Sequence, residues 1–203
     1  MAFTTYLTVT IGTQVWMAEN LRVTHYRNGE AIPNVTWDDE WADLFTGAYC
    51  EFNDDVNNVT IYGRLYNWYA VDDNRNIAPT GWHVPTDTEW KQLEMYLDMS
   101  QSEADAVGDR GTDEGGKLKE SGTAHWLSPN TGATNESGFT ALPGGFRGRS
   151  GDYFAMGSYA VFWSATANWS EVAWFRCLFH SYAQVGRYSD YKQHGFSVRC
   201  VKD

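Results

Sequence analysis

The apolar residues of this chain of 203 residues come in short runs that Gly and Asn interrupt throughout. Few segments keep a helical period for long, and the C-terminal part breaks into short aromatic-rich pieces. This pattern predicts an irregular, loop-rich α+β fold. With 42% hydrophobic residues the chain can bury a real core, and its length fits a single domain over residues 1–203.

Charge excludes several kinds of partner. The formal net charge is -11, so the chain repels phosphate backbones and anionic membrane surfaces, and we expect no nucleic-acid partner. No stretch approaches the roughly 20 apolar residues that span a bilayer, and the start shows no basic region followed by an apolar run. The sequence therefore predicts neither direct membrane insertion nor a visible signal peptide.

Local signals predict a hairpin and two short helices. The segment from Thr8 to Trp16 places β-branched residues around Gly12-Thr13, which is a hairpin pattern. Residues 63–71 (GRLYNWYAV) have apolar side chains at helical spacing and predict a short helix with an aromatic buried face.

The clearest helix start follows Pro85. Thr86 and Glu89 have the spacing of a capping box, and an apolar stripe then begins at Trp90. We expect an amphipathic helix that ends at about Asp98.

The rest of the chain predicts loops and then strands. Residues 100–135 are rich in Gly, Asp, Glu, Ser and Thr, and we expect long surface loops there. Consecutive strands are predicted at 139–147, 162–166, 173–178, 183–187 and 195–201. In the last of these, apolar residues alternate with Ser197 and Arg199, as in a strand with one face on the core.

The sequence carries no catalytic or zinc signature. Its histidines lie in no nucleophile motif, and no GxSxG, HExxH or P-loop pattern occurs, so we predict a protein that is not an enzyme. His83 is interpreted as a core or hydrogen-bonding histidine. The cysteines, Cys50, Cys177 and Cys200, are odd in number and lack CxxC spacing, which argues against structural zinc and leaves open one disulfide with one free thiol.

Acidic and amide residues offer a weak calcium pattern. The residues concerned are Asp54, Asp55, Asn57, Asn58, Asp72, Asp73 and Asn74. Their oxygens suit calcium, but the EF-hand spacing is absent, and these residue types are standard turn formers. We therefore predict no metal and no cofactor, with calcium left open.

The segment 169–194 carries the strongest indication of function. Its first strand separates two sets by parity: Trp174, Arg176 and Leu178, and Phe175, Cys177 and Phe179. Residues 188–194 then mix Tyr with Ser, Asp, Gln and His, which is poor core material and resembles a paratope in composition. Exposed aromatics among polar residues indicate an interaction site. The alternative is that these aromatic residues cover a second small core.

Ordered motifs give a family resemblance from about Thr8 to the end of the chain. They are TVTIGTQVWMAENLR, YGRLYNWYAV, PTGWHVPTDTEW, NESGFTALPGGFR, FWSAT and GFSVRCV. Together they resemble the Fibrobacter succinogenes major paralogous domain. That family looks related to the formylglycine-generating-enzyme branch of the C-type lectin-like fold, so the resemblance implies two short helices with small twisted antiparallel sheets and long loops.

The C-terminal layout also resembles variable proteins of diversity-generating retroelements, in which chosen codons on a lectin-like scaffold are mutated to create new binding surfaces. This resemblance implies a variable region at about 156–194. Framework positions would be Trp174, Arg176, Leu178, Val185, Arg187, Lys192 and Gly195. The variable, ligand-binding positions would be Trp169, Phe175, Cys177, Phe179, His180, Ser181, Tyr182, Gln184, Gly186, Tyr188, Ser189, Asp190, Tyr191, Gln193 and His194.

The expected function is therefore non-catalytic recognition of a protein or glycan ligand, with the chain on a bacterial cell surface or phage virion. Buried tryptophans would hold the scaffold: Trp68, Trp82, Trp90, Trp163 and Trp174. The aromatic anchors of binding would be Trp169, Phe175, Phe179, Tyr182, Tyr188 and Tyr191. Polar residues would tune specificity: His180, Ser189, Asp190 and Gln193.

Two alternatives remain. One is a cell-surface or adhesin-like module of the same family, with fixed glycan- or protein-binding loops. The other is a relative of the formylglycine-generating enzymes that uses Cys177 or Cys200, although no match to their catalytic cysteine arrangement is found. Ala78 stands where family members commonly have a cysteine, so no bridge from there to Cys200 forms, and this departure weakens a disulfide-stabilised extracellular interpretation.

Overall fold

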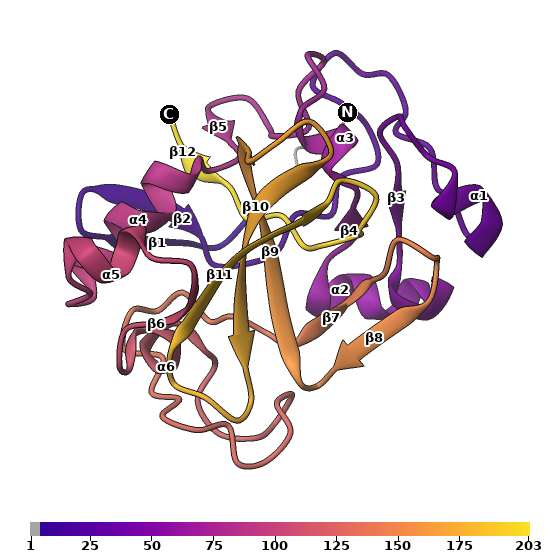
Figure 1. Cartoon of the computed structure of the whole chain (residues 1–203). Helices are drawn as coiled ribbons and strands as arrows, with labels where there is room; N and C mark the ends of the chain where they lie inside the picture. The colour runs from indigo at the N-terminus through magenta and orange to yellow at the C-terminus, as the bar shows by residue number, and fades with distance from the viewer. Residues whose placement is uncertain (1–4) are drawn as a thin grey trace.

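The computed structural model describes residues 5–203 and contains three sheets (Figure 1). The six-stranded sheet has the order β6-β11-β10-β9-β7-β8, the four-stranded sheet β1-β2-β12-β5, and the small sheet β3-β4. Paired strands are antiparallel except β7 and β9, which run parallel. The strands are β1 (Thr8–Ile11), β2 (Gln14–Met17), β3 (Tyr49–Cys50), β4 (Leu65–Tyr66), β5 (Trp82–His83), β6 (Gly108–Arg110), β7 (Gly144–Arg147), β8 (Tyr153–Met156), β9 (Tyr159–Ala167), β10 (Val172–Phe179), β11 (Val185–Tyr191) and β12 (Val201–Lys202).

The helices are all short. They are α1 (Asp38–Ala42), α2 (Val59–Tyr62), α3 (Trp68–Val71), α4 (Asp87–Tyr96), α5 (Gln101–Asp105) and α6 (Glu114–Leu118), with 3₁₀ turns η1 (Phe52–Asp54) and η2 (Val56–Asn58). This mixture of short helices and small sheets agrees with the predicted α+β class. The described residues hold more than the two helices that the family resemblance implied.

Two local predictions are confirmed. Strands β1 and β2 form the predicted hairpin, with Ile11 opposite Gln14 and Gly12 at a positive φ of 62° in the turn. Helix α4 begins after Thr86, whose hydroxyl accepts from the Glu89 backbone while the Glu89 side chain accepts from the Thr86 backbone. This reciprocal capping box satisfies backbone donors that the first helical turn leaves free.

The helix predicted over residues 63–71 is wrong in its first half. Leu65–Tyr66 form strand β4, and helix α3 begins only at Trp68. The Asn67 side chain accepts a hydrogen bond from the Ala70 backbone and so caps the helix at that point. Gly63 at a φ of 74° separates this strand from helix α2.

The loops predicted over residues 100–135 are also interrupted by elements. Helices α5 and α6 and strand β6 lie within this range, and β6 extends the six-stranded sheet by pairing with β11. Ser100 and Glu103 form a second capping box, which starts α5. The composition indicated long surface loops, but capping and sheet pairing build regular elements into this segment.

The strand predicted at 195–201 is wrong as well. Residues 195–200 are all buried, on both parities. Gly195, Phe196 and Ser197 form isolated bridges to strands β7, β4 and β9, and only Val201–Lys202 form a strand, β12. Ser197 and Arg199 are inside because Asn20 accepts from Arg199 and donates to Ser197. The alternation was therefore between apolar core residues and buried, hydrogen-bonded polar residues.

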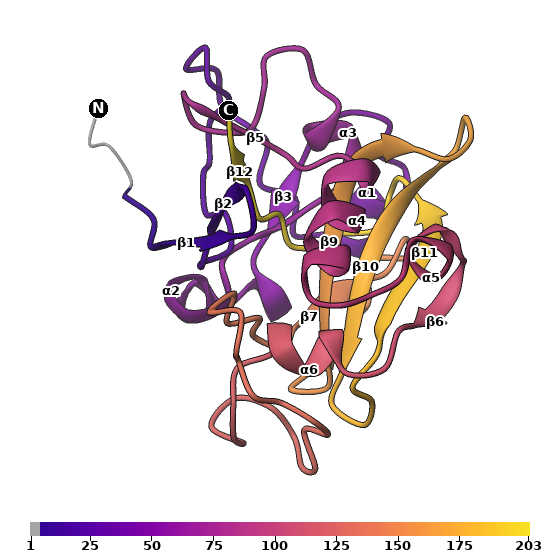
Figure 2. The same ribbon diagram turned by 90° about the vertical axis from the view of Figure 1, so that its left-hand side faces the viewer.

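Tryptophans do anchor the core, but the predicted set needs correction. Trp68, Trp90 and Trp163 are buried, whereas Trp82 and Trp174 are only partly so. Fully or almost fully buried tryptophans that were not predicted are Trp16, Trp41 and Trp126. Helices α4 and α5 lie beside one face of the six-stranded sheet (Figure 2).

Candidate functional site

The hairpin of β10 and β11 sorts its side chains onto two faces. Phe175 pairs with Tyr188 across the ladder, and Arg176 pairs with Arg187. Because directly opposed residues of an antiparallel pair share a face, the first pair lies on one side of the sheet and the second pair on the other. We call these the pocket face (Phe175, Cys177, Phe179, Gly186, Tyr188, Asp190) and the frame face (Trp174, Arg176, Leu178, Val185, Arg187, Ser189).

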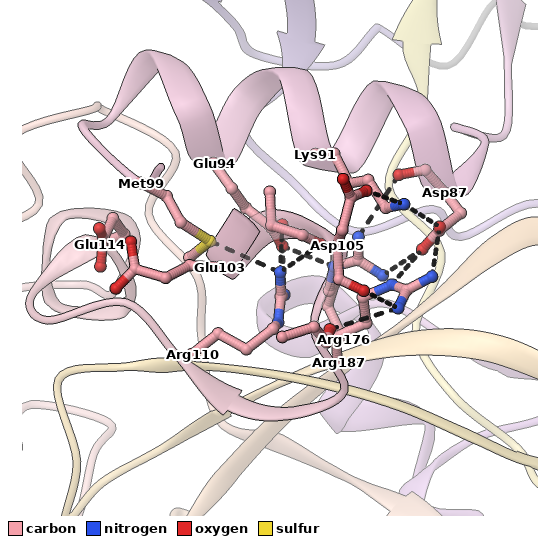
Figure 3. Close-up of polar contacts among 12 residues, drawn as sticks. Asp87, Lys91, Glu94, Met99, Glu103, Asp105, Arg110, Glu114, Arg176 and Arg187 are labelled. Atoms are coloured by element: carbon pink, nitrogen blue, oxygen red, sulfur yellow. Dashed lines mark hydrogen bonds and ion pairs between the residues drawn. The ribbon is translucent and has the colours of Figure 1, made fainter. Parts of the chain in front are cut away.

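Buried ion pairs join the frame face to helix α4 (Figure 3). Asp87 accepts from Arg176 Nη1 at 2.8 Å and from Arg187 Nη2 at 2.7 Å. Glu94 accepts from Arg176 Nε at 2.5 Å and from Arg110 of β6 at 2.9 Å. Two carboxylates of helix α4 are therefore paired with arginines from three neighbouring strands, β6, β11 and β10, and their charges are compensated.

Asp87 shows how strong this compensation is. Burial alone would raise the pKa of its carboxyl, but hydrogen bonds from Arg187 and the charge of Arg176 outweigh burial and hold that pKa well below its ordinary value. Arg187 also stacks on Trp174, with 3.7 Å between the guanidinium and the ring centroid. The frame face is thus fixed by charge as well as by packing.

On the pocket face the structure forms an open cavity of about 190 Å³, which we call the aromatic pocket. Strands β7, β9, β10 and β11 and the segment that follows β11 all contribute to it. Its lining residues are Phe146, Tyr159, Val161, Phe175, Cys177, Phe179, Tyr188, Asp190, His194 and Phe196. Six of the predicted ligand-binding positions meet here: Phe175, Cys177, Phe179, Tyr188, Asp190 and His194.

Aromatic rings build most of the lining. Phe196 is buried and packs against Phe175, with ring centroids 4.9 Å apart. Tyr159 and Phe179 meet edge to face at 4.8 Å and 80°. Phe175 and Phe179 are partly buried and pack against the core, so they combine the two roles weighed from the sequence: each covers core and each lines the pocket.

Asp190 and His194 supply the pocket's polar groups. His194 Nε2 lies 3.3 Å from Asp190 Oδ1, and that oxygen also accepts from the Tyr191 backbone at 2.8 Å. Desolvation raises the pKa of Asp190. The hydrogen bond and the charge of His194 outweigh this effect and hold the pKa of the carboxyl below its ordinary value. The Tyr188 hydroxyl points to Asp109, to whose Oδ1 it donates at 2.8 Å.

Cys177 joins a histidine and an aspartate in the same pocket, which raises the question of thiol catalysis. Its thiol is buried, and burial raises the pKa well above the ordinary value. Sγ makes a weak contact of 4.0 Å with Leu178 O, and the residues described show no hydrogen bond from it to His194. A nucleophilic thiol needs a depressed pKa and a base in contact, so this arrangement does not activate Cys177.

A second hollow adjoins the end of the hairpin. It is lined by Ala42, Phe45, Tyr69, Arg149, Ser150, Glu171, Tyr191 and Gln193. Two predicted positions, Tyr191 and Gln193, lie here. Tyr191 is 39% exposed, and the Arg149 guanidinium lies 4.4 Å from its ring centroid.

The predicted positions in the β10–β11 turn lie at the opposite end of the hairpin. Ser181 and Tyr182 are exposed and His180 is partly exposed. Lys119 fixes this turn, because its buried ammonium donates to the backbone oxygens of Phe179 and Tyr182 at 2.9 and 2.8 Å. Burial lowers the pKa of Lys119 to about 8.

The remaining predicted positions are scattered. Trp169 is 74% exposed in the β9–β10 turn, and Gln184 is half-buried just before β11. Ser189 lies on the frame face, where its hydroxyl accepts from Asn168 at 3.0 Å. Gly186 is buried opposite Cys177, which is also buried. The prediction that these two positions belong to an exposed surface is therefore wrong.

Comparison with known families adds one decisive match. Residues 9–202 match the family model described as the Fibrobacter succinogenes major domain. The chain belongs to this family. No curated protein and no solved structure matches the sequence. As a member of the Fibrobacter succinogenes major domain family, the chain has its hairpin and aromatic pocket inside the matched range.

Four pocket residues of this family member were not among the predicted positions: Phe146, Tyr159, Val161 and Phe196. Phe146 and Phe196 lay in predicted strands, but nothing local in the sequence reveals that both meet the β10–β11 hairpin. Tyr159 pairs with Phe179 in the β9–β10 ladder, so a correct register for β9 would have placed it beside the pocket.

The histidine and acidic patterns resolve into structural contacts. His83 bonds to Glu89 at 2.7 Å and to Asp203 at 2.8 Å, as expected of a hydrogen-bonding histidine. Asp55 caps η2, and Asp73 binds Arg75. Within residues 5–203 no cluster of His, Cys, Asp and Glu has the arrangement of a metal site. Over the same range all three cysteines are free thiols, and no helix is long and apolar enough to cross a bilayer.

Proposed function

We propose that this chain is a non-catalytic ligand-binding protein whose binding surface is the pocket face of the β10–β11 hairpin together with the second hollow. The observation that carries the proposal is the convergence of Phe175, Phe179 and Tyr188 on an open aromatic pocket, on the face opposite the buried Arg176 and Arg187 pairs. Concave apolar sites with few polar groups are the usual form of ligand pockets.

The two faces of the hairpin support a division of labour. Removing one partner of a buried ion pair is strongly destabilising, so the frame face tolerates little change. Exposed positions such as Tyr182 and Tyr191 carry little of the fold, and substitutions there typically change stability by less than about 0.5 kcal/mol. A binding surface of this kind can change its residues while the fold persists.

On this basis we further propose a C-type lectin-like scaffold that displays a diversified surface over about residues 156–194, as in the variable proteins of diversity-generating retroelements. Its ligand would be a protein or a glycan at a cell surface, with the chain itself on a bacterial surface or phage virion. The family membership and the full or partial exposure of most of the proposed positions support this proposal.

Non-catalytic function is the interpretation that fits the thiols best. Cys177 and Cys200 are buried, and burial raises the pKa of each above its ordinary value. An oxidase of the formylglycine-generating type needs a reactive cysteine, so thiol alkylation that abolishes a detected oxidase activity would contradict our proposal.

Sequencing the 3′ end of the gene from many isolates tests diversification. We expect substitutions at the proposed positions while Arg176 and Arg187 stay unchanged, together with a reverse transcriptase gene and an Asn-rich near-copy of the 3′ end beside the gene. Substitutions spread evenly over Arg176, Arg187 and the proposed positions would refute the division of labour. An invariant region without the neighbouring genes would favour a fixed adhesin-like module.

A further inference from the structure

The aromatic pocket has an unusual pairing of groups, which bears on the class of ligand it takes. Aromatic rings from several strands surround it, and its only acidic residue is Asp190. None of its lining residues is a lysine or an arginine, and the one basic side chain in the lining is His194, which contacts Oδ1 of Asp190. Aromatic faces carry negative potential, so the rings and the carboxylate both favour a positively charged group.

Size limits the part of a ligand that enters. The cavity measures about 190 Å³. Pockets for drug-sized ligands are larger, about 300–1,000 Å³, so this pocket accepts one compact group. The remainder of the ligand must lie outside the aromatic pocket, toward the second hollow. The two sites are neighbours, because His194 lines the aromatic pocket and Tyr191 lines the second hollow.

The polar groups decide among compact occupants. A sugar ring would bury several hydroxyls against phenyl rings with few partners, which is costly. An anion would meet the charged Asp190. A neutral hydrocarbon would cover that carboxylate without compensating its charge. Oδ1 of Asp190 accepts a hydrogen bond from the Tyr191 backbone and contacts His194, whereas Oδ2 forms no hydrogen bond with residues 5–203. A soft, weakly hydrated cation avoids all three penalties.

Arg149 adds a complementary charge next to the pocket. It is exposed, it lines the second hollow beside Tyr191, and its positive charge is close enough to contribute to lowering the pKa of Asp190. A ligand that carries a cation and, a few bonds away, an anion would satisfy Asp190 and Arg149 together. The side chain of a methylated lysine offers only the cation.

We propose that the aromatic pocket binds the trimethylammonium group of phosphocholine, with the phosphate directed toward Arg149. This inference rests on the proposed ligand-binding function and names the ligand class for the same site. The rings around Phe175 and Phe196 enclose the methyl groups, Asp190 compensates the charge, and the phosphate stays at the solvent-exposed rim. A phosphocholine-bearing surface glycan or lipid head group would present this chemistry.

A titration of the full chain at pH 7.5, followed by ¹⁵N chemical shifts and by calorimetry, tests the proposal. The probes are phosphocholine, choline, N-acetyl-trimethyllysine and 3,3-dimethylbutan-1-ol, which is the neutral isostere of choline. We expect saturable shifts on β10 and β11 with phosphocholine, and about tenfold weaker binding of the neutral isostere than of choline. Phosphocholine should bind more tightly than choline or trimethyllysine.

Variants assign the effect to named residues. Asp190→Asn should weaken choline and phosphocholine about tenfold. Arg149→Gln should weaken phosphocholine while leaving choline unchanged. A matched control is Asp152→Asn, which removes an exposed carboxylate outside the pocket and should bind as the parent does. Thermal unfolding of each variant shows that it is folded.

Each contrary outcome has a distinct meaning. Equal affinity for choline and its neutral isostere, or no effect of Asp190→Asn on affinity, would refute recognition of a positive charge. The pocket would still be a binding site. Tighter binding of N-acetyl-trimethyllysine than of phosphocholine would refute phosphocholine as the ligand that supplies the trimethylammonium group. Absence of binding by every probe overturns the ligand class, whereas the proposed function is decided separately by the pattern of substitutions among isolates.

Discussion

Replacing Asp87 with Asn tests the stability that the frame face contributes. The change keeps the side-chain volume but removes the charge that accepts hydrogen bonds from Arg176 and Arg187 at 2.7–2.9 Å. Breaking a buried pair in this way costs about 3–5 kcal/mol. For a chain of this size, 1 kcal/mol shifts Tm by about 2–4 °C, so we expect a fall in Tm of roughly 6–20 °C.

Differential scanning calorimetry measures this shift, and Asp190→Asn provides the control. Asp190 is also a carboxylate of the hairpin region, but its side chain is 41% exposed on the pocket face. We expect its loss to change stability by less than about 0.5 kcal/mol, that is, by about 2 °C or less. Equal shifts for the two variants, or a shift below about 2 °C for Asp87→Asn, would refute the assignment of stability to the frame face.

Three further outcomes follow from the same contacts. The pKa of Asp87 is lowered in the fold, so the Tm difference between the parent and Asp87→Asn should be full above the ordinary pKa of 3.8 and should shrink as the pH falls further below it. The pKa of Lys119 is lowered to about 8, so between pH 8 and 10.5 the unfolded chain binds more protons and the parent should gain stability with rising pH relative to Lys119→Met; calorimetry of both across this range checks the sign. Cys50, Cys177 and Cys200 are buried with raised pKa values, so Ellman's reagent should react with none of them before unfolding; rapid labelling of the native chain would contradict this.

Local chemistry was readable from the sequence where neighbours along the chain settle the structure. The turn at Gly12 and the capping box at Thr86 depend on a few adjacent residues, and both are present. The parity of β10 was also readable, because Trp174, Arg176 and Leu178 alternate with Phe175, Cys177 and Phe179 along the strand. The split of 63–71 between β4 and α3 was missed because pairing with β3 outweighs helical spacing.

The pocket could be predicted only in part, since its walls come from distant segments. Phe175 and Tyr188 follow from the hairpin, whereas Phe196 reaches the same site after a segment whose polar residues are buried instead of exposed. Asn20 satisfies Arg199 across 179 residues of chain, and no local pattern reveals such a partner. The variable region, the single-domain assignment and the lectin-like fold stay predictions.

Gly186 gives the hairpin a means of adjustment. A β-carbon at this position would lie 2.7 Å from Cε2 of Tyr188, a ring whose hydroxyl is tethered to Asp109. Any larger residue there would displace the ring and weaken the hydrogen bond between Tyr188 and Asp109, while the neighbouring Arg187 still pairs with Asp87 of helix α4. A substitution at this single position would therefore change the shape of the cavity through the Tyr188 ring, while the ion pairs of the frame face stay in place.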